Sequence, residues 1–250
     1  MRRLLSVFFW AFVLLSSLVL FPLAMLIFLV TAPFDRRRAL LHRFTCFWAS
    51  LYTWLNPAWS VTIHGRDRLH HAGPTVIVAN HLSLLDILVM FRLQSHFKWV
   101  SKIENFRVPL IGWNMTLCGY IPLQRGTKTS VMSMMRACDE ALGKGSSIVM
   151  FPEGTRSATG RMRAWKPGAF EIAQRNGVPI QPLVIRGTGD ALPKRGFVLQ
   201  GRHEISIEIL DPVPPHEVEK TETEEMMARV RGRIAERLDA DMPAAARTAR

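Results

Sequence analysis

The chain has 250 residues, 48% of them hydrophobic, which is enough for one well-buried α/β domain and leaves little length for a second. Its 32 Lys and Arg residues outnumber its 20 Asp and Glu residues. The net charge of +12 favours a phospholipid surface, a phosphorylated substrate or nucleic acid as partner, unless it reflects only a solvated basic surface. Three scattered cysteines indicate neither a disulfide framework nor a zinc site. Sequence motifs for nucleotide binding, zinc hydrolysis and serine hydrolysis are absent.

The first predicted element is an uncharged apolar segment from Leu4 to Val30. About 20 apolar residues are enough to cross the hydrocarbon core, so the segment predicts a retained membrane anchor. A cleaved signal peptide is the alternative, with Val30-Thr31-Ala32 as its cleavage site. The length of the apolar run and Pro33 directly after that site argue against cleavage.

Basic residues flank this segment on both sides, at Arg2–Arg3 and at Arg36–Arg38. The positive-inside rule therefore does not fix its orientation. The arrangement would suit a hairpin or an in-plane insertion that returns both ends to the anionic cytoplasmic face. From Ala39 to Pro57, apolar and aromatic residues recur at helical spacing and predict a second helix. That helix lies either at the membrane interface or against the globular core.

Short β-rich runs alternate with helical stretches after Pro57, which predicts an α/β fold with a mixed, largely parallel sheet flanked by helices. The division that follows is membrane-anchoring helices at 1–57, a catalytic domain at 58–241 and a disordered tail at 242–250. Strands are predicted at Trp59–His64, Thr75–Ala79, Phe97–Ser101, Gly119–Leu123, Ser147–Phe151, Ile180–Ile185 and Glu204–Leu210. Helices are predicted at Leu84–Leu93, Thr127–Leu142, Gly168–Asn176 and Pro215–Asp239.

The first motif with chemical meaning is N-H-L-S-L-L-D, from Asn80 to Asp86, directly after the apolar run T-V-I-V-A. A neutral imidazole can take the proton of an attacking hydroxyl, and a carboxylate on its other nitrogen stabilises the imidazolium. Five residues of regular helix would leave His81 and Asp86 about 140° apart, so their contact requires a non-helical start at His81. Ser83 either caps the following helix or orients the substrate.

A second motif, F-P-E-G-T-R-S from Phe151 to Ser157, again follows an apolar strand. Gly154 permits close backbone approach, Thr155 offers a hydroxyl, and Arg156 offers a bidentate fork for phosphate. Glu153 either orients Arg156 or binds a glycerol hydroxyl. Another predicted strand ends in Arg125, and the two arginines could converge on one phosphate if their strands are neighbours.

Together these segments resemble the glycerolipid acyltransferases, specifically the 1-acyl-sn-glycerol-3-phosphate acyltransferases. The family patterns N-H-x-S-x-x-D and F-P-E-G-T-R-S match Asn80–Asp86 and Phe151–Ser157 in full. The block ending in Arg125 and the proline-containing stretch Val178–Pro182 resemble two further family blocks, in the same order. The resemblance covers roughly residues 59–210, and the hydrophobic start is similar to the membrane-binding helices of bacterial members.

The resemblance implies a role for each matching residue. His81 would be the catalytic base and Asp86 its partner. The acceptor phosphate would bind Arg125 and Arg156, with added positive charge from Lys102. Residues that would shape the substrate site are Asn80, Ser83, Glu153, Gly154 and Thr155, with Pro179 on the acyl-donor side.

The predicted function is transfer of a fatty acyl group from acyl-CoA or acyl-carrier protein to the sn-2 hydroxyl of lysophosphatidic acid, giving phosphatidic acid. No metal or organic cofactor is expected, and the partners are the membrane surface, the lysophospholipid and the acyl donor rather than nucleic acid. The expected location is the inner membrane, with the site facing the cytoplasm. Two alternatives are acyl transfer to another acceptor, such as a lyso-ornithine lipid, and an inactive lipid-binding protein.

Overall fold

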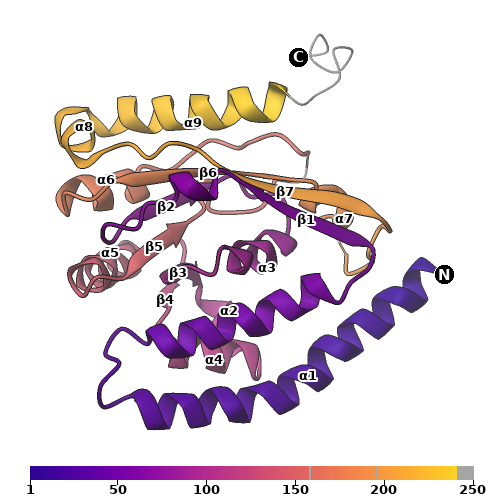
Figure 1. Cartoon of the computed structure of the whole chain (residues 1–250). Coiled ribbons are helices and arrows are strands. Elements are labelled where there is room, and N and C mark those ends of the chain that lie inside the picture. Colours follow the sequence, from indigo (N-terminus) through magenta and orange to yellow (C-terminus); the bar gives the residue numbers. More distant parts are fainter. Residues whose placement is uncertain (158, 195, 241–250) are drawn as a thin grey trace.

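The computed structural model describes residues 1–157, 159–194 and 196–240. Its centre is a seven-stranded sheet in the order β1-β7-β6-β2-β5-β3-β4 (Figure 1). The strands are β1 (Trp59–His64), β2 (Val76–Ala79), β3 (Phe97–Lys102), β4 (Ile121–Leu123), β5 (Ser147–Met150), β6 (Ile180–Arg186) and β7 (His203–Ile209). Each lies within two residues of the strand predicted from the sequence.

Five of these strands run in the same direction. β6, β2, β5, β3 and β4 are parallel, whereas β7 is antiparallel to β6 and carries β1 parallel to itself. The predicted mixed, largely parallel sheet is therefore confirmed. Because parallel strands end on the same side, the loops after all five meet at one edge of the sheet, where α/β proteins place their ligands. We call this edge the carboxyl edge.

Helices cover both faces of the sheet (Figure 1). One face carries α5 (Lys128–Gly143), α6 (Gly168–Arg175), α8 (Pro215–Lys220) and α9 (Thr223–Ala240); the other carries α2 (Ala39–Trp54), α3 (Leu85–Met90) and α4 (Ile111–Leu117), while α7 (Thr188–Ala191) follows β6. Along β2, Ile77 packs into the core under α2 and α3, and Val76 and Val78 pack into the core under α6. Burial on both faces explains the continuous apolar sequence of this strand.

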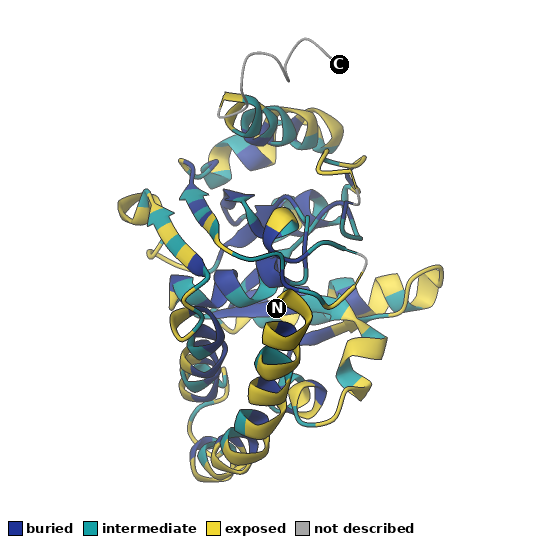
Figure 2. Ribbon diagram, turned by 90° about the vertical axis from the view of Figure 1, so that its right-hand side faces the viewer, coloured by how far each residue is buried: buried dark blue, intermediate teal, exposed yellow. Residues whose placement is uncertain are grey.

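The long helix α1 (Arg2–Thr31) forms an outer layer against α2 and α4. It contacts the protein along its length: Trp10 donates to the carbonyl of Phe197, and the ring of Phe21 meets that of Trp113. Its outward side chains remain exposed, and Figure 2 shows the side of the helix nearest the viewer largely in yellow. Among the described residues, α1 is the one helix long and apolar enough to cross a membrane.

The second helix, α2, packs on the globular core. Leu41, Trp48 and Tyr52 are buried in the same cluster as the strands, so the core-packed alternative for this helix is confirmed. The sheet and α2 therefore share one core across the predicted division at residue 57. The predicted tail, 242–250, lies outside the described residues.

Two helical predictions differ from the structure. The predicted helix over 215–239 is two helices, because Thr221 adopts an extended conformation after α8 and its hydroxyl bonds back to the Glu217 carbonyl. The helix α4 was not predicted. Pro109 lies two residues before this helix and Gly112 is its second residue, and both residue types disfavour helix. Gly112 is required there, because a β-carbon would lie 2.5 Å from the backbone of Phe106.

Candidate active site

The loop after β2 is fixed to β6 by the side chain of Asn80. Its amide donates to the carbonyl of Ile185 and accepts from the N–H of the same residue, both at 2.8 Å. Asn80 is fully buried, so its side chain continues the hydrogen-bond ladder one residue beyond the strand. This pairing positions the next residue, His81, at the carboxyl edge.

His81 and Asp86 form a direct pair, with 2.8 Å between His81 Nδ1 and Asp86 Oδ2. The helix α3 begins only at Leu85, so His81 lies in a non-helical turn, as the predicted contact requires. Asp86 Oδ2 also accepts the N–H groups of Leu82 and Ser83, at 2.7 and 2.9 Å. Because the buried carboxylate can only accept, Nδ1 carries the proton and Nε2 has a free lone pair.

The imidazole of His81 is held in plane by aromatic stacking. Its centroid lies 4.0 Å from that of Phe151 with 7° between the ring planes, and Phe151 stacks in turn on Trp99. The His81 side chain keeps 13% of its surface exposed. Nε2 has no hydrogen-bond partner among the residues that the structure describes. One ring nitrogen is thus anchored, and the other is available to a substrate.

Ser83 has a structural position. Its buried hydroxyl donates to the carbonyl of Leu192 at 2.6 Å and accepts the N–H of Leu85 at 3.1 Å. The N-cap position of α3 is Leu84, and no side chain caps the helix there, so Ser83 bonds to the first residue of α3 from one position before the N-cap. Both contacts point into the protein, so the alternative of orienting a substrate has no support here.

Glu153 braces the two motifs against each other. One carboxylate oxygen accepts the N–H of His81 at 2.8 Å and the other accepts the N–H of Arg163 at 2.9 Å. Burial raises the pKa of this carboxyl above its ordinary value, and the two backbone N–H groups partly oppose that effect. Among the described residues Glu153 forms no hydrogen bond or ion pair with Arg156, and the suggested contact with a glycerol hydroxyl stays a prediction. Glu153 shapes the site by fixing the backbone of His81.

The turn after β5 carries positive charge to the same edge. The N–H of Ser157 donates to the carbonyl of His81 at 2.8 Å, which places Arg156, half-buried, beside the base. Gly154 has a left-handed backbone, with φ of 66°, and the side chain of Lys166 passes over it. Lys166 is exposed, so a second cation lies against the turn that holds Arg156 and Thr155.

Arg125 and Lys102 lie farther along the edge. The condition for direct convergence of Arg125 and Arg156 is not met, because β3 separates β4 from β5. Neighbouring strands of a sheet are about 4.8 Å apart, so the ends of β4 and β5 are about 10 Å apart. Two arginine side chains can bridge that gap only by extending towards each other. Lys102 is exposed and pairs with Glu104 at 3.1 Å, which offsets part of its charge.

The sequence comparisons agree with this geometry. The model of a family described as acyltransferase matches residues 60–186, just over half of the chain and the segment that carries both motifs. The chain belongs to the acyltransferase family. A 1-acyl-sn-glycerol-3-phosphate acyltransferase of Chlamydomonas reinhardtii is 35% identical over 86% of this chain and 65% of that protein. The chloroplastic enzyme of the same name, LPAT1, from Arabidopsis thaliana is 33% identical over 95% of this chain and 65% of that protein.

This acyltransferase chain thus spans just under two thirds of the length of these curated relatives. Its fold matches a crystal structure of the 1-acyl-sn-glycerophosphate acyltransferase PlsC from Thermotoga maritima, with a TM-score of 0.76 at 21% identity. That match covers 96% of this chain and 97% of the other.

The acyltransferase site does not include Pro179. This residue precedes β6, which is parallel to β2, so it lies at the opposite edge of the sheet from His81. Its carbonyl accepts from the hydroxyl of Thr75 and the N–H of Val76. Pro179 therefore joins the starts of two strands, and the role on the acyl-donor side implied by the resemblance has no support from this position.

Sequence reasoning missed two contributors to the acyltransferase site. Trp99, which completes the aromatic stack under His81, lies inside a buried strand and carried no signal of its own. Lys166 follows the second motif in K-P-G, and only the fold shows that it crosses Gly154. Among the described residues, no group of three or more His, Cys, Asp or Glu side chains is arranged to hold a metal ion.

Proposed function

We propose that the protein transfers a fatty acyl group from an acyl thioester to the sn-2 hydroxyl of lysophosphatidic acid, forming phosphatidic acid. The observation that carries the proposal is the His81–Asp86 pair, with Nε2 of the imidazole unpaired among the described residues, at an edge that also presents Arg156 and Lys166. Family membership and the names of the relatives support the same reaction.

In the proposed mechanism His81 acts as the general base. Nε2 accepts the proton of the sn-2 hydroxyl as its oxygen bonds to the carbonyl carbon of the thioester. The tetrahedral intermediate collapses by breaking the carbon–sulfur bond, and the imidazolium returns the proton to the departing thiolate. Asp86 holds the tautomer and stabilises the imidazolium during the interval. The attacking group is the substrate's own hydroxyl, so no covalent enzyme intermediate is required.

The acceptor phosphate binds on the side of the edge that carries the cations. Arg156 and Lys166 lie on or over the turn beside His81, and Arg125 lies two strands away. Guanidinium groups bind phosphate oxygens in bidentate fashion, which fixes the glycerol backbone as well as the charge. In this proposal Gly154 and Thr155 shape the turn, and Lys102 adds a more distant charge.

The reaction as proposed uses no metal or organic cofactor, because the imidazole removes the proton and the cations neutralise the phosphate. The co-substrate is acyl-CoA or acyl-carrier protein. Nucleic acid has no place in this proposal, and the basic surface serves the lipid substrate and the membrane.

The membrane association suggested by α1 is proposed to be in-plane, at the cytoplasmic face of the inner membrane. Because α1 packs along α2 and α4, a spanning orientation would draw the charged catalytic domain into the hydrocarbon region. The exposed apolar side chains of α1 and the arginines at both of its ends suit insertion into one anionic leaflet. All three cysteines are free and buried, which is consistent with a reducing compartment.

The test is acyl transfer by the purified full chain in mixed micelles, with palmitoyl-CoA and palmitoyl-acyl-carrier protein supplied separately. The acceptors are lysophosphatidic acid, a lyso-ornithine lipid and neutral-headgroup lysophospholipids, and the products are identified by mass spectrometry. We expect phosphatidic acid to form fastest. Preferential acylation of another acceptor would overturn the acceptor assignment, and no transfer to any acceptor would overturn the proposed function.

A further inference from the structure

Apolar side chains that stay in solvent occur in the catalytic domain as well as on α1. Beyond α2 and the Leu55 that follows it, six large hydrophobic side chains are exposed among the described residues. Two of them, Val131 and Met132, lie on α5. The other four lie in or next to segments that contact α1, and we call them the flanking patch: Val108, Ile111, Trp113 and Phe197. Single exposed apolar residues are ordinary, whereas a group of them against an apolar helix indicates a binding surface.

Phe197, between α7 and β7, is held against the first half of α1. Trp10 donates to its carbonyl at 2.7 Å, and the two rings lie edge to face with 5.4 Å between centroids. The N–H of Leu199 donates to the buried hydroxyl of Ser6 at 2.9 Å. The backbone here is therefore fixed to α1, yet the Phe197 side chain is 67% exposed. This ring does not fill the core and is presented to whatever α1 faces.

The rest of the flanking patch surrounds a strained turn at the start of α4. Trp113 is 49% exposed, and its ring lies 5.6 Å from that of Phe21 of α1 between centroids. Leu110 has a φ of 63°, which is rare for a bulky residue, and its side chain packs against the core. Val108 and Ile111, on either side of it, are exposed. A strained turn that leaves two apolar residues in water costs stability, which a partner that covers them would offset.

The flanking patch borders one side of α1 and α2 borders the other. Trp10 and Phe21, which contact the patch, are about three turns of helix apart and so lie on the same side of α1. Phe9, whose ring meets that of Tyr52 on α2, lies about 100° around the helix from Trp10. In Figure 1, α1 forms the lower border of the molecule, with α2 and α4 above it. The outward side chains of α1 therefore lie between two apolar borders.

Exposed arginines accompany this apolar surface. They lie at both ends of α1, on α2 and directly before Val108: Arg2, Arg3, Arg36, Arg37, Arg43 and Arg107. Apolar side chains with cations at their margin are complementary to an anionic bilayer, which takes the former into its acyl region and the latter among its headgroups. A self-complementary interface would instead bring these arginines towards those of a second copy. The charges thus favour lipid as the occupant.

We propose that the flanking patch inserts into the same anionic leaflet as α1, so that the catalytic domain itself binds the bilayer. The inference rests on the membrane association proposed for α1 and goes beyond it, because a single helix lying in a leaflet is free to roll about its axis. The patch on one side of α1 fixes that roll and therefore the direction of the carboxyl edge.

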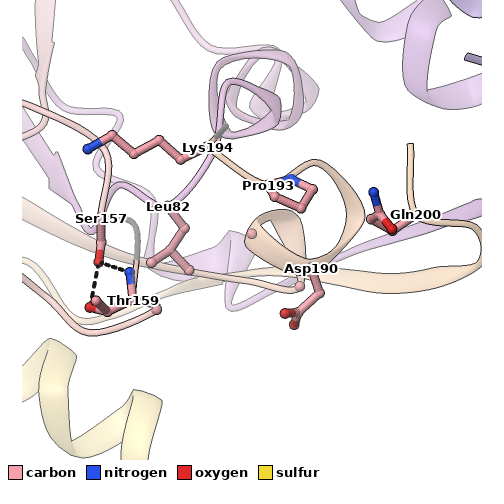
Figure 3. Close-up of a pocket in the computed structure, with 10 residues that line it drawn as sticks. Leu82, Ser157, Thr159, Asp190, Pro193, Lys194 and Gln200 are labelled. Atoms are coloured by element: carbon pink, nitrogen blue, oxygen red, sulfur yellow. Dashed lines mark hydrogen bonds between the residues drawn. The ribbon is translucent and has the colours of Figure 1, made fainter. Parts of the chain in front are cut away.

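The segment that carries Phe197 also borders the carboxyl edge. Pro193, Lys194 and Gln200 line a cleft of about 640 Å³ next to Leu82, the residue that follows His81 (Figure 3). Insertion of Phe197 therefore holds this part of the carboxyl edge at the lipid surface. An acceptor that is dissolved in the leaflet then reaches the edge without crossing bulk water.

The first test measures which positions enter the bilayer. The native cysteines are buried, so a cysteine-reactive NBD fluorophore labels Trp113→Cys, Phe197→Cys, Leu15→Cys on the outward side of α1, and Val131→Cys on α5. Each full-length protein is bound to phosphatidylcholine–phosphatidylglycerol vesicles that contain a lipid with a shallow doxyl quencher. We expect the labels at 15, 113 and 197 to lose about half of their fluorescence, and the label at 131 less than about a tenth.

The second test asks whether the patch matters for access to the acceptor. Ile111→Ser with Phe197→Ser is compared with Val131→Ser with Met132→Ser, which removes exposed apolar side chains elsewhere. We expect the first variant to raise the KM for vesicle-bound oleoyl-lysophosphatidic acid about threefold or more. The KM for hexanoyl-lysophosphatidic acid, which is monomeric in water, and the melting temperature should stay unchanged, as should all values of the control variant. An equal rise for both acceptors would contradict the inference.

The outcomes separate the inference from the proposals beneath it. Quenching at 15 without quenching at 113 and 197 would overturn the inference and leave the membrane association of α1 intact. Absence of quenching at 15 would remove that association and the inference with it. Cross-linking of two copies through a cysteine at 113, without quenching there, would assign the patch to a second copy and overturn the lipid assignment. Absence of acyl transfer to either acceptor by the unmodified protein would remove the proposed function, whatever the quenching shows.

Discussion

Two histidines on the same side of the sheet show what distinguishes a base from a structural residue. His42, on α2, is 1% exposed, with Nδ1 2.8 Å from the hydroxyl of Tyr120 and Nε2 3.0 Å from the carbonyl of Ser95. Burial, followed by His96 and Lys98, holds the pKa of His42 well below its ordinary value. His81 has one nitrogen on a carboxylate and the other unpaired among the described residues. Both histidines make polar contacts, but only His81 keeps a nitrogen lone pair that can accept a proton from a substrate.

The comparison predicts its largest effect for His81→Ala. The substrate hydroxyl is a poor nucleophile while protonated, and a positioned general base contributes about 10²–10⁴-fold. We expect turnover to fall by that order, with little change in KM, melting temperature or membrane binding. His64→Ala, at an exposed position on β1, is the control. Near-normal turnover by well-folded His81→Ala protein would contradict the mechanism.

Asp86→Asn should have the next largest effect. An asparagine oxygen can still accept from the backbone N–H groups of Leu82 and Ser83, but it carries no charge to stabilise the imidazolium. We expect turnover to fall by roughly ten- to a hundredfold. In the double variant with His81→Ala the two losses of turnover should not add, because each change disables the same His81–Asp86 pair. Fully additive losses, measured in the same assay, would mean that the two residues act independently.

The arginines offer a test on the acceptor side. Each of Arg156→Ala and Arg125→Ala removes a charge-assisted contact worth about 1.5–3 kcal/mol, so the KM for the phosphorylated acceptor should rise roughly ten- to a hundredfold. The effect of Arg156→Ala should be the greater, because its turn is bonded to His81. The KM of the donor is measured in parallel. Equal changes for both substrates would count against the phosphate assignment.

His42→Ala should show the opposite pattern to His81→Ala. It leaves the buried hydroxyl of Tyr120 and the carbonyl of Ser95 without their partner and opens a cavity, at a cost of about 2–5 kcal/mol of stability. Turnover per folded molecule, measured well below the melting temperature, should stay within about twofold. A large loss of turnover without loss of stability would erase the distinction between the two histidines.

The smallest expected effect is a loss of folding stability on acidification, and it arises at His96, next to His42. Burial, with Lys98 and Arg37 nearby, lowers the pKa of His96 from 6.5 to about 4. Between these values the unfolded chain binds more protons than the folded one, so stability should be lost as the pH falls from about 6.5 to about 4. Melting temperatures of the unmodified protein and of His96→Asn across this range provide the check. The variant should depend less on pH, and an equal slope in both would contradict the assignment.

Predictions from the sequence were most accurate where a local pattern is compatible with only one kind of structure. The strands were located closely because burial on both faces produces short apolar runs between turns, as in Val76–Ala79. The contact of His81 with Asp86 was predicted together with the irregular turn that it needs. For Ser83 two roles were left open, and its hydroxyl bonds within the protein, to the carbonyl of Leu192 and to the N–H of Leu85, one residue outside the N-cap of α3.

What could not be predicted depends on strand order and on long-range packing. Whether Arg125 and Arg156 lie on neighbouring strands is a property of the whole sheet, and β3 separates them. The distance of Pro179 from the site follows from the direction of β6 and not from its sequence neighbours.

The pairing of β1 with β7 has a consequence for the order in which the protein is made. Trp59 is synthesised early and pairs with His203, which is synthesised much later, so the sheet is completed only near the end of translation. Pairings of such long sequence separation form slowly. The apolar helix α1, in contrast, needs no distant partner to bind a lipid surface. We therefore expect the nascent chain to bind a lipid surface before β2, β5 and β6 assemble around His81, so that the proposed site would be completed at the membrane.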